Sequence, residues 1–217
     1  MLPVGGGTNL ATAVPVPGRP RGARALAAPD RGRPSLVEPT ARAGCRRVAG
    51  ASRMPIIDDL FAANAAYADR FALGDLPMPP RRKLVVIACM DARFDPLSAL
   101  GLAEGDANVL RNSGGRTTED VIRSLVVSQQ RLGTEAVLVV HHTDCGTLTF
   151  GNDDIRAQVR ERLGADADGI DFLPFADVDQ SVRDDVAAIR DSPLVPASVT
   201  VAGAVYDDRT GRLRRVE

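Results

Sequence analysis

Short apolar runs rich in β-branched residues recur along the chain after residue 80. They predict four strands, at 84–88 (LVVIA), 106–111 (DANVLR), 136–141 (AVLVVH) and 198–206 (SVTVAGAVY). A turn at 208–211 then leads into a short extended segment, 212–216. Runs this continuously apolar are typical of parallel strands that are buried on both faces of a sheet.

Between these runs, apolar residues three and four positions apart predict helices. The expected helices lie at 55–72, 117–132, 153–163 and 178–190. Thr117 or Thr118 is the expected N-cap of the second helix, and Gly133 marks its end. Because strands alternate with helices, we predict an α/β fold with a mostly parallel central sheet flanked by helices. In such a sheet the ligand site lies at the carboxyl ends of the strands.

The first 53 residues differ in composition from the rest of the chain. They contain no aromatic residue, seven of the 15 prolines, and nine arginines against two acidic residues, a net charge of +7. Since the whole chain carries −1, the remainder carries −8. A segment with so little apolar surface does not offset its ordering entropy. We therefore expect residues 1–53 to be a disordered leader and residues 54–217 to be one domain.

Two other interpretations of residues 1–53 remain open at this stage. One is that the true start is Met54 and the leader is translated from upstream sequence. The other is an organellar transit peptide, which is also Arg-rich and poor in acidic residues. Gly, Pro and Arg interrupt every candidate for the apolar stretch of a secretory signal. We expect the domain to be cytoplasmic.

Charge and hydropathy exclude two classes of partner. A net charge of −1 argues against a basic nucleic-acid-binding protein. No apolar run approaches the ~18 residues that suggest a membrane-spanning helix. We therefore expect neither a nucleic-acid partner nor a membrane partner.

Reactive side chains gather at the ends of the first and third predicted strands. Cys89, Asp91 and Arg93 follow one strand, and His142 and Cys145 follow the other. Taken singly, Cys89 is more often a buried apolar residue, and an Asp–Arg pair is more often a surface ion pair. Taken jointly, two cysteines and a histidine are a recognised catalytic zinc set with its fourth position open.

The remaining cysteine and histidine residues do not fit this set. His141 adjoins His142, and adjacent strand residues point to opposite faces, so we expect the two not to bind the same ion. Cys45 lies in the leader, outside any motif. A disulfide between Cys89 and Cys145 is the alternative use of these thiols, and a reducing cytosol disfavours it.

The motifs together resemble the β-class carbonic anhydrases. Cys-x-Asp-x-Arg at 89–93 is followed by His-x-x-Cys at 142–145. Between them, residues 111–114 resemble the family's Arg-Asn-Ala-Gly segment, with Ser113 in place of Ala, and 120–125 resembles the helix that comes after it. The resemblance covers nearly all of residues 54–217 and none of the leader.

This resemblance implies a function and a set of residues for it. The reaction is the reversible hydration of carbon dioxide to bicarbonate and a proton by a zinc-bound hydroxide, which makes the protein a lyase. One zinc ion per chain is bound by Cys89, His142 and Cys145, and Asp91 and Arg93 match the catalytic dyad. His141 matches no such role. The resemblance also implies a homo-oligomer, either a dimer or a tetramer.

Charge suggests why this zinc site needs the dyad. Two thiolates cancel the +2 charge of the ion, so its water is acidified less than in a three-histidine site. Asp91 accepts a hydrogen bond from that water, and Arg93 holds Asp91 ionised. In the family, the matching Asp binds the zinc itself when the Arg releases it. Two other functions remain open: hydrolysis of carbon disulfide or carbonyl sulfide, and a non-catalytic zinc- or bicarbonate-binding module.

Overall fold

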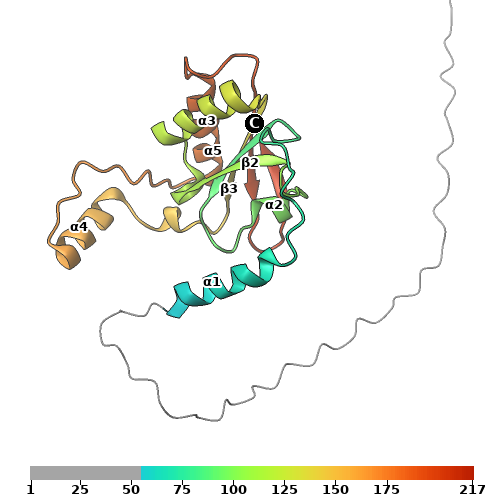
Figure 1. The fold of residues 1–217 in the computed structure, drawn as a ribbon. Coiled ribbons are helices and arrows are strands. Elements are labelled where there is room, and N and C mark those ends of the chain that lie inside the picture. Colours follow the sequence, from blue (N-terminus) through green and yellow to red (C-terminus); the bar gives the residue numbers. More distant parts are fainter. Residues whose placement is uncertain (1–54) are drawn as a thin grey trace, which may run out of the picture. The chain divides into compact units, whose positions relative to one another are not determined.

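A five-stranded sheet organises the part of the chain that the structure, a computed structural model, describes: residues 55–217 (Figure 1). Its strands are β1 (Leu84–Cys89), β2 (Ala107–Asn112), β3 (Ala136–His142), β4 (Thr200–Tyr206) and β5 (Leu213–Val216). They lie in the order β2-β1-β3-β4-β5, and only β5 is antiparallel to its neighbour. The predicted α/β fold with a mostly parallel sheet is confirmed. The expected leader, residues 1–53 with Cys45, lies outside the described residues.

The predicted helices are present, together with short helical turns that the sequence pattern does not reveal. The helices are α1 (Pro55–Ala68), α2 (Pro96–Ala99), α3 (Glu119–Leu132), α4 (Asn152–Leu163) and α5 (Val178–Arg190), and the 3₁₀ turns are η1 (Ser113–Gly115) and η2 (Gly146–Thr149). The first helix ends at Ala68, before the predicted limit of 72. Turns such as α2 and η1 are too short for a hydrophobic period to develop.

The ends of α3 follow the predicted capping chemistry. Of the two candidate threonines, Thr118 is the N-cap, and its hydroxyl accepts a hydrogen bond from the Val121 backbone N–H at 3.3 Å. Gly133 ends the helix in the left-handed conformation, with φ of 66°.

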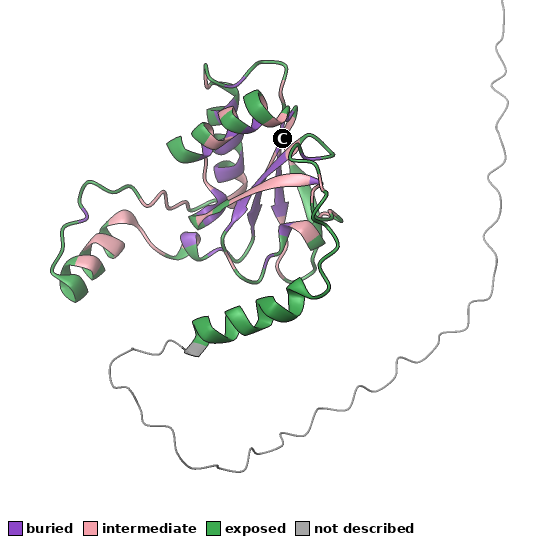
Figure 2. Cartoon of the chain, viewed as in Figure 1, coloured by how far each residue is buried: buried purple, intermediate pink, exposed green. Residues whose placement is uncertain are grey.

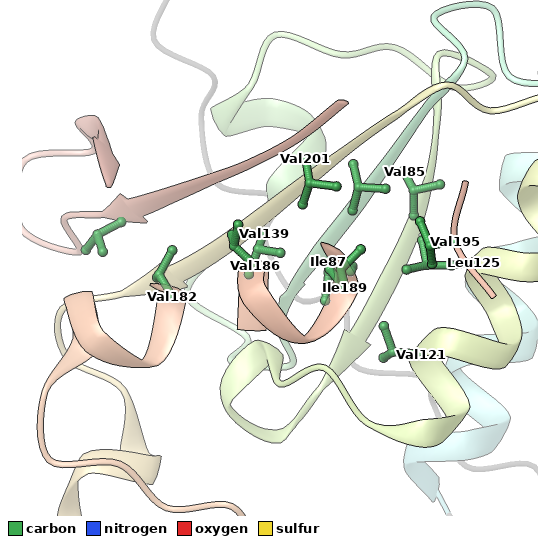
Figure 3. Close-up of a cluster of buried hydrophobic side chains, with 12 residues drawn as sticks. Val85, Ile87, Val121, Leu125, Val139, Val182, Val186, Ile189, Val195 and Val201 are labelled. Carbon is green, nitrogen blue, oxygen red and sulfur yellow. The ribbon is translucent and has the colours of Figure 1, made fainter. Parts of the chain in front are cut away.

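The two faces of the sheet are buried in different ways. On one face, α3 and α5 cover β1, β3 and β4 through a cluster of aliphatic side chains (Figure 3). On the other face, a smaller cluster includes Val86, Ala88, Phe94 and Val140. Because successive residues of β1 alternate between these two clusters, the strand has no polar position.

Helices α1 and α4 contribute little to this core. Every residue from 56 to 73 is exposed, and α4 contains no buried residue (Figure 2). The exposed side chains of α1 include Ile56, Leu60 and Phe61, the last with 74% of its surface accessible. None of the helices in residues 55–217 is both long enough and apolar enough to span a membrane.

Gly203 of β4 allows α5 to lie close against the sheet. A Cβ atom built at this position would lie 2.3 Å from Val182 Cγ1 and 3.1 Å from Val186 Cγ2. Both valines belong to the buried cluster beneath α5. The close approach of helix and strand therefore requires glycine here.

Gly203→Ala is expected to lower the free energy of unfolding by about 1–3 kcal/mol, because Val182 must leave its rotamer or α5 must shift. Urea denaturation measures this change. Gly169→Ala is the matched control, since a Cβ there meets nothing within 4 Å, and it should change stability by less than about 0.5 kcal/mol. Equal stability of the two variants would show that α5 is not held against β4 at this point.

Candidate metal centre

The carboxyl ends of three neighbouring strands build one site. β1 ends at Cys89, β3 ends at His142, and Asp208 lies just beyond the end of β4. Cys145 lies in the turn between β3 and η2. Because β1, β3 and β4 are parallel neighbours, their carboxyl ends meet at the same edge of the sheet.

Cys89, His142 and Cys145 form a compact set of donor atoms. Their ligand atoms all lie within 4.8 Å of one another, and all three residues are buried. The two sulfur atoms are 3.8 Å apart, well beyond the ~2.05 Å of a disulfide bond, and both thiols are free. Two sulfur donors and one imidazole nitrogen are a ligand set typical of zinc.

His142 presents an unpartnered nitrogen to this set. Its Nδ1 atom lies 2.9 Å from Asp208 Oδ2 and 3.0 Å from Oδ1, so Nδ1 carries the proton and donates it to the carboxylate. Nε2 is then left as an acceptor, and it is buried without a hydrogen-bond partner. A buried unsatisfied nitrogen is unfavourable, and a bound metal ion removes that cost. The residues present therefore fit a metal ion.

The same neighbours change the acidity of the two thiols. The Cys145 thiol and the backbone N–H groups of Asp91 and Gly114 favour the Cys89 thiolate, so the pKa of Cys89 is lowered although burial opposes this. The pKa of Cys145 is raised, because its thiol proton is held by Cys89 and because burial disfavours a second charge. One thiolate is thus already favoured, and a metal ion would displace the second proton.

Asp91 lies beside the donor atoms and is held by Arg93. The guanidinium donates from Nη2 to Oδ2 at 2.7 Å and from Nε to Oδ1 at 3.0 Å. These hydrogen bonds hold the pKa of Asp91 below its usual range, so the carboxylate is ionised at neutral pH. Arg93 is fixed in turn by Asp144, whose Oδ2 accepts from Nη1 at 2.6 Å and whose backbone oxygen accepts from Nη2 at 2.8 Å.

Arg111 holds the loop that carries Asp91 and Arg93. Its Nε donates to the Cys89 backbone oxygen at 2.8 Å, and its Nη2 donates to the backbone oxygens of Asp91 and Phe94 at 2.6 and 2.9 Å. One guanidinium therefore connects the end of β2 to three carbonyl groups of this loop.

Asp208 is the residue of this site that the sequence pattern does not single out, since it reads only as part of the turn before β5. In the structure it accepts hydrogen bonds from His142 Nδ1, from the Asp144 backbone N–H at 2.7 Å and from Thr143 Oγ1 at 3.3 Å. Its signal in the sequence is its place just after a parallel strand, the rule that also selects Cys89 and His142.

His141 points away from the donor atoms. Its Nδ1 lies 2.6 Å from the Ser181 hydroxyl of α5, and its ring stacks on Phe175 with the centroids 5.5 Å apart. The two adjacent histidines therefore serve opposite faces of the sheet.

Comparisons with known proteins agree with this geometry. Residues 84–213 match the sequence model of the carbonic anhydrase family. The chain is 41% identical over 165 residues to beta-carbonic anhydrase 1 of Mycobacterium bovis, which covers 75% of this chain and 99% of that protein. It is 33% identical over 174 residues to a carbon disulfide hydrolase of Acidithiobacillus thiooxidans, which covers 71% of this chain and 85% of that one.

A solved structure shares the fold as well as the sequence. The crystal structure of a carbonic anhydrase from Streptococcus mutans matches with a TM-score of 0.73 and 48% identity, over 76% of this chain and 99% of that one. The family match spans more than half of the chain and contains all five residues of the predicted site. The chain therefore belongs to the β-carbonic anhydrase family.

Proposed function

We propose that this protein is a zinc-dependent carbonic anhydrase that catalyses the reversible hydration of carbon dioxide to bicarbonate and a proton. The observation that carries the proposal is the buried set Cys89, His142 and Cys145, with an unpartnered nitrogen, beside the ion pair of Asp91 and Arg93. These three residues would hold one zinc ion per chain. When bound, zinc would supply a Lewis acid that lowers the pKa of a water molecule.

Asp91 has the geometry of a group that orients the attacking water. Its Oδ2 atom is 4.0 Å from His142 Nε2, so it lies next to the donor set. An ionised carboxylate only accepts hydrogen bonds, which directs the water's lone pair toward carbon dioxide. Arg93 engages both carboxylate oxygens and so favours the arrangement in which Asp91 is not itself a ligand.

Asp208 supports the site from behind His142. Its carboxylate fixes the ring tautomer and raises the basicity of Nε2, as the outer partners of ligating histidines commonly do. It raises the pKa of His142 together with the Cys89 thiolate, against the opposing effect of burial. The proposal therefore assigns Asp208 a positioning role and not a place among the ligands.

Carbon disulfide hydrolysis is the second candidate function, because one relative at 33% identity carries that name. Carbonyl sulfide is a third candidate substrate of the same chemical type. Parallel assays of the zinc-loaded protein with the three compounds separate these functions. We expect carbon dioxide to be turned over fastest, and faster turnover of carbon disulfide would overturn the first candidate.

Asp91→Ala is expected to reduce carbon dioxide hydration about 100-fold or more while zinc content stays near one per chain, because the water loses its orienting acceptor. Stopped-flow hydration with metal analysis measures both quantities. Asp95→Asn is the matched control, since it neutralises a carboxylate of the same loop and preserves the cap of α2.

Three outcomes would contradict the proposed function or its mechanism. Hydration by Asp91→Ala at the parent rate would contradict the orienting role of Asp91, and a zinc-loaded parent protein without hydration activity would favour a non-catalytic zinc- or bicarbonate-binding module. Full hydration activity of a zinc-free Cys89→Ser variant would exclude zinc from the reaction.

Asp208→Asn is expected to weaken zinc binding about 10–100-fold, because the amide keeps the shape of the side chain and loses its charge. Competition with a chromophoric chelator measures the affinity. Asp207→Asn is the control, because Asp207 caps the turn through the Arg209 and Thr210 backbone N–H groups and is not bonded to His142. Equal zinc affinity of both variants would remove Asp208 from the metal centre.

We also propose that the protein forms a homodimer or a larger even assembly such as a tetramer, and that it acts in the cytoplasm without nucleic-acid or membrane partners. The 14-residue α1 exposes Ile57, Leu60 and Phe61, and a helix of this length is marginal in water without packing. A second copy of the chain would cover this face. The free thiols of Cys89 and Cys145 suit a reducing compartment.

Leu60→Asp combined with Phe61→Asp is expected to convert the assembly to monomers, because charges replace the apolar face of α1. Light scattering coupled to size-exclusion chromatography measures the mass. Leu194→Asp, another exposed apolar position outside α1, serves as the control and should leave the mass unchanged. A double variant with the mass of the parent protein would show that α1 does not hold the copies together.

A further inference from the structure

Behind the donor set, a second group of polar side chains is buried between the sheet and α5. It consists of Arg116, His141, Ser181 and Asp185, and the last three are almost fully inaccessible. Asp185 Oδ2 accepts from Arg116 Nε at 2.7 Å, and its Oδ1 accepts from the Thr117 backbone N–H at 2.8 Å. The function proposed above uses none of these residues.

The hydrogen-bond partners of His141 define how its ring is held. Nε2 lies 3.2 Å from the Gly115 backbone oxygen and 3.1 Å from Asp185 Oδ2. Both are acceptors, so Nε2 carries a proton and donates. Nδ1 lies 2.6 Å from the Ser181 hydroxyl oxygen, which holds the other side of the ring. His141 therefore ties η1 to α5 through the Gly115 carbonyl group.

The turn η1 also packs tightly against the end of β1, next to the candidate ligand Cys89. A Cβ atom on Gly115 would lie 2.9 Å from the Cys89 backbone nitrogen and 3.3 Å from His141 Cδ2. Gly115 has a φ of 71°, a conformation that favours glycine. Little space therefore remains between the His141 ring, the turn and the end of β1.

This turn packs directly against one of the candidate ligands. A Cβ built on Gly115 would lie 2.9 Å from the Cys89 backbone nitrogen, and the carbonyl oxygen of the same glycine lies 3.2 Å from His141 Nε2. The structure that surrounds a ligand sets the orientation of its side chain. A path of direct contacts thus runs from α5 through His141 and η1 to Cys89.

We propose that His141 is a positioning residue of the metal centre: by holding the Gly115 carbonyl from the far side of the sheet, it keeps η1 packed against the Cys89 backbone and so fixes the position of the Cys89 side chain. Ser181 and Asp185 fix the ring, and Arg116 fixes Asp185. This inference rests on the proposed function only in taking zinc as the metal.

A different use of these residue types does not fit the geometry. Serine, histidine and aspartate also form hydrolytic triads, in which the hydroxyl is open to a substrate. Here Ser181 is 1% exposed, and its Oγ also lies 2.9 Å from the Val178 carbonyl of its own helix. No substrate reaches this hydroxyl, so the group acts on structure.

The test compares metal binding by variants of this group. His141→Leu, which removes the bond to Gly115, should weaken zinc binding about 10–100-fold in competition with a chromophoric chelator. With Co²⁺ in place of zinc, its thiolate-to-metal absorption band should shift. His141→Gln, whose amide can donate to the Gly115 carbonyl, should recover part of the zinc affinity and shift the cobalt band part of the way back. Ser128→Ala is the control, because it removes a buried hydroxyl that bonds Thr134 and Asn108 outside this group.

A folded His141→Leu protein with the parent zinc affinity and the parent cobalt spectrum would overturn the proposal. If His141→Leu does not fold, Ser181→Ala decides the question, since it frees the ring and leaves the imidazole in place. It should weaken zinc binding about threefold or more, and an unchanged affinity overturns the proposal. If the variants lose zinc affinity as expected and the parent protein does not hydrate carbon dioxide, only the proposed hydration function is refuted. If the parent protein hydrates carbon dioxide and the substitutions leave zinc affinity unchanged, only the positioning role of His141 is refuted.

Discussion

The parallel pairing of β1 with β3 and of β3 with β4 is the constraint on which the site depends. Ala88 pairs with Val140 and His142 pairs with Tyr206, so residues that lie far apart in sequence end their strands at one edge. Continuous apolar faces hold this register, because a slip by one residue would turn buried valines out of both clusters. Burial of both faces of the sheet therefore holds the register that brings the donor atoms of the candidate metal centre together.

Opposite charges then fix the loops beyond the strand ends. Asp91, Arg93 and Asp144 form a connected set of ion pairs across two loops, and Asp208 joins the second loop to His142. Burial of the Asp91 and Asp208 carboxylates strengthens their contacts, whereas the pair of Arg93 and Asp144 is exposed. The arrangement keeps a carboxylate ionised beside the donor atoms and leaves His142 Nε2 free to bind a metal.

The two faces of β3 serve the site in different ways. His142 presents its ring to the donor set, and His141 presents its ring to α5. The close fit of α5 at Gly203 and the wedged turn at Gly115 leave little freedom behind the site. The packing of α5 on one face of the sheet therefore affects the geometry of the candidate ligands at the sheet's edge. It does so through residues that are not themselves ligands.

Hydrophobic patterning along the sequence predicts the α/β class, the strands and the longer helices, and the sequence motifs predict five side chains of the candidate site. The period of apolar residues is a local property that predicts where each strand ends. Because ligand sites lie at the carboxyl ends of parallel strands, it also predicts that Cys89 and His142 belong to one site. The hydrogen-bond partners of those side chains become visible only in the folded structure. In the sequence Asp208 has the pattern of a turn residue and His141 has no assigned role, because the residues that each contacts are remote in sequence. Helix α1 has a helical pattern, and only the fold shows that the sheet leaves its apolar face uncovered.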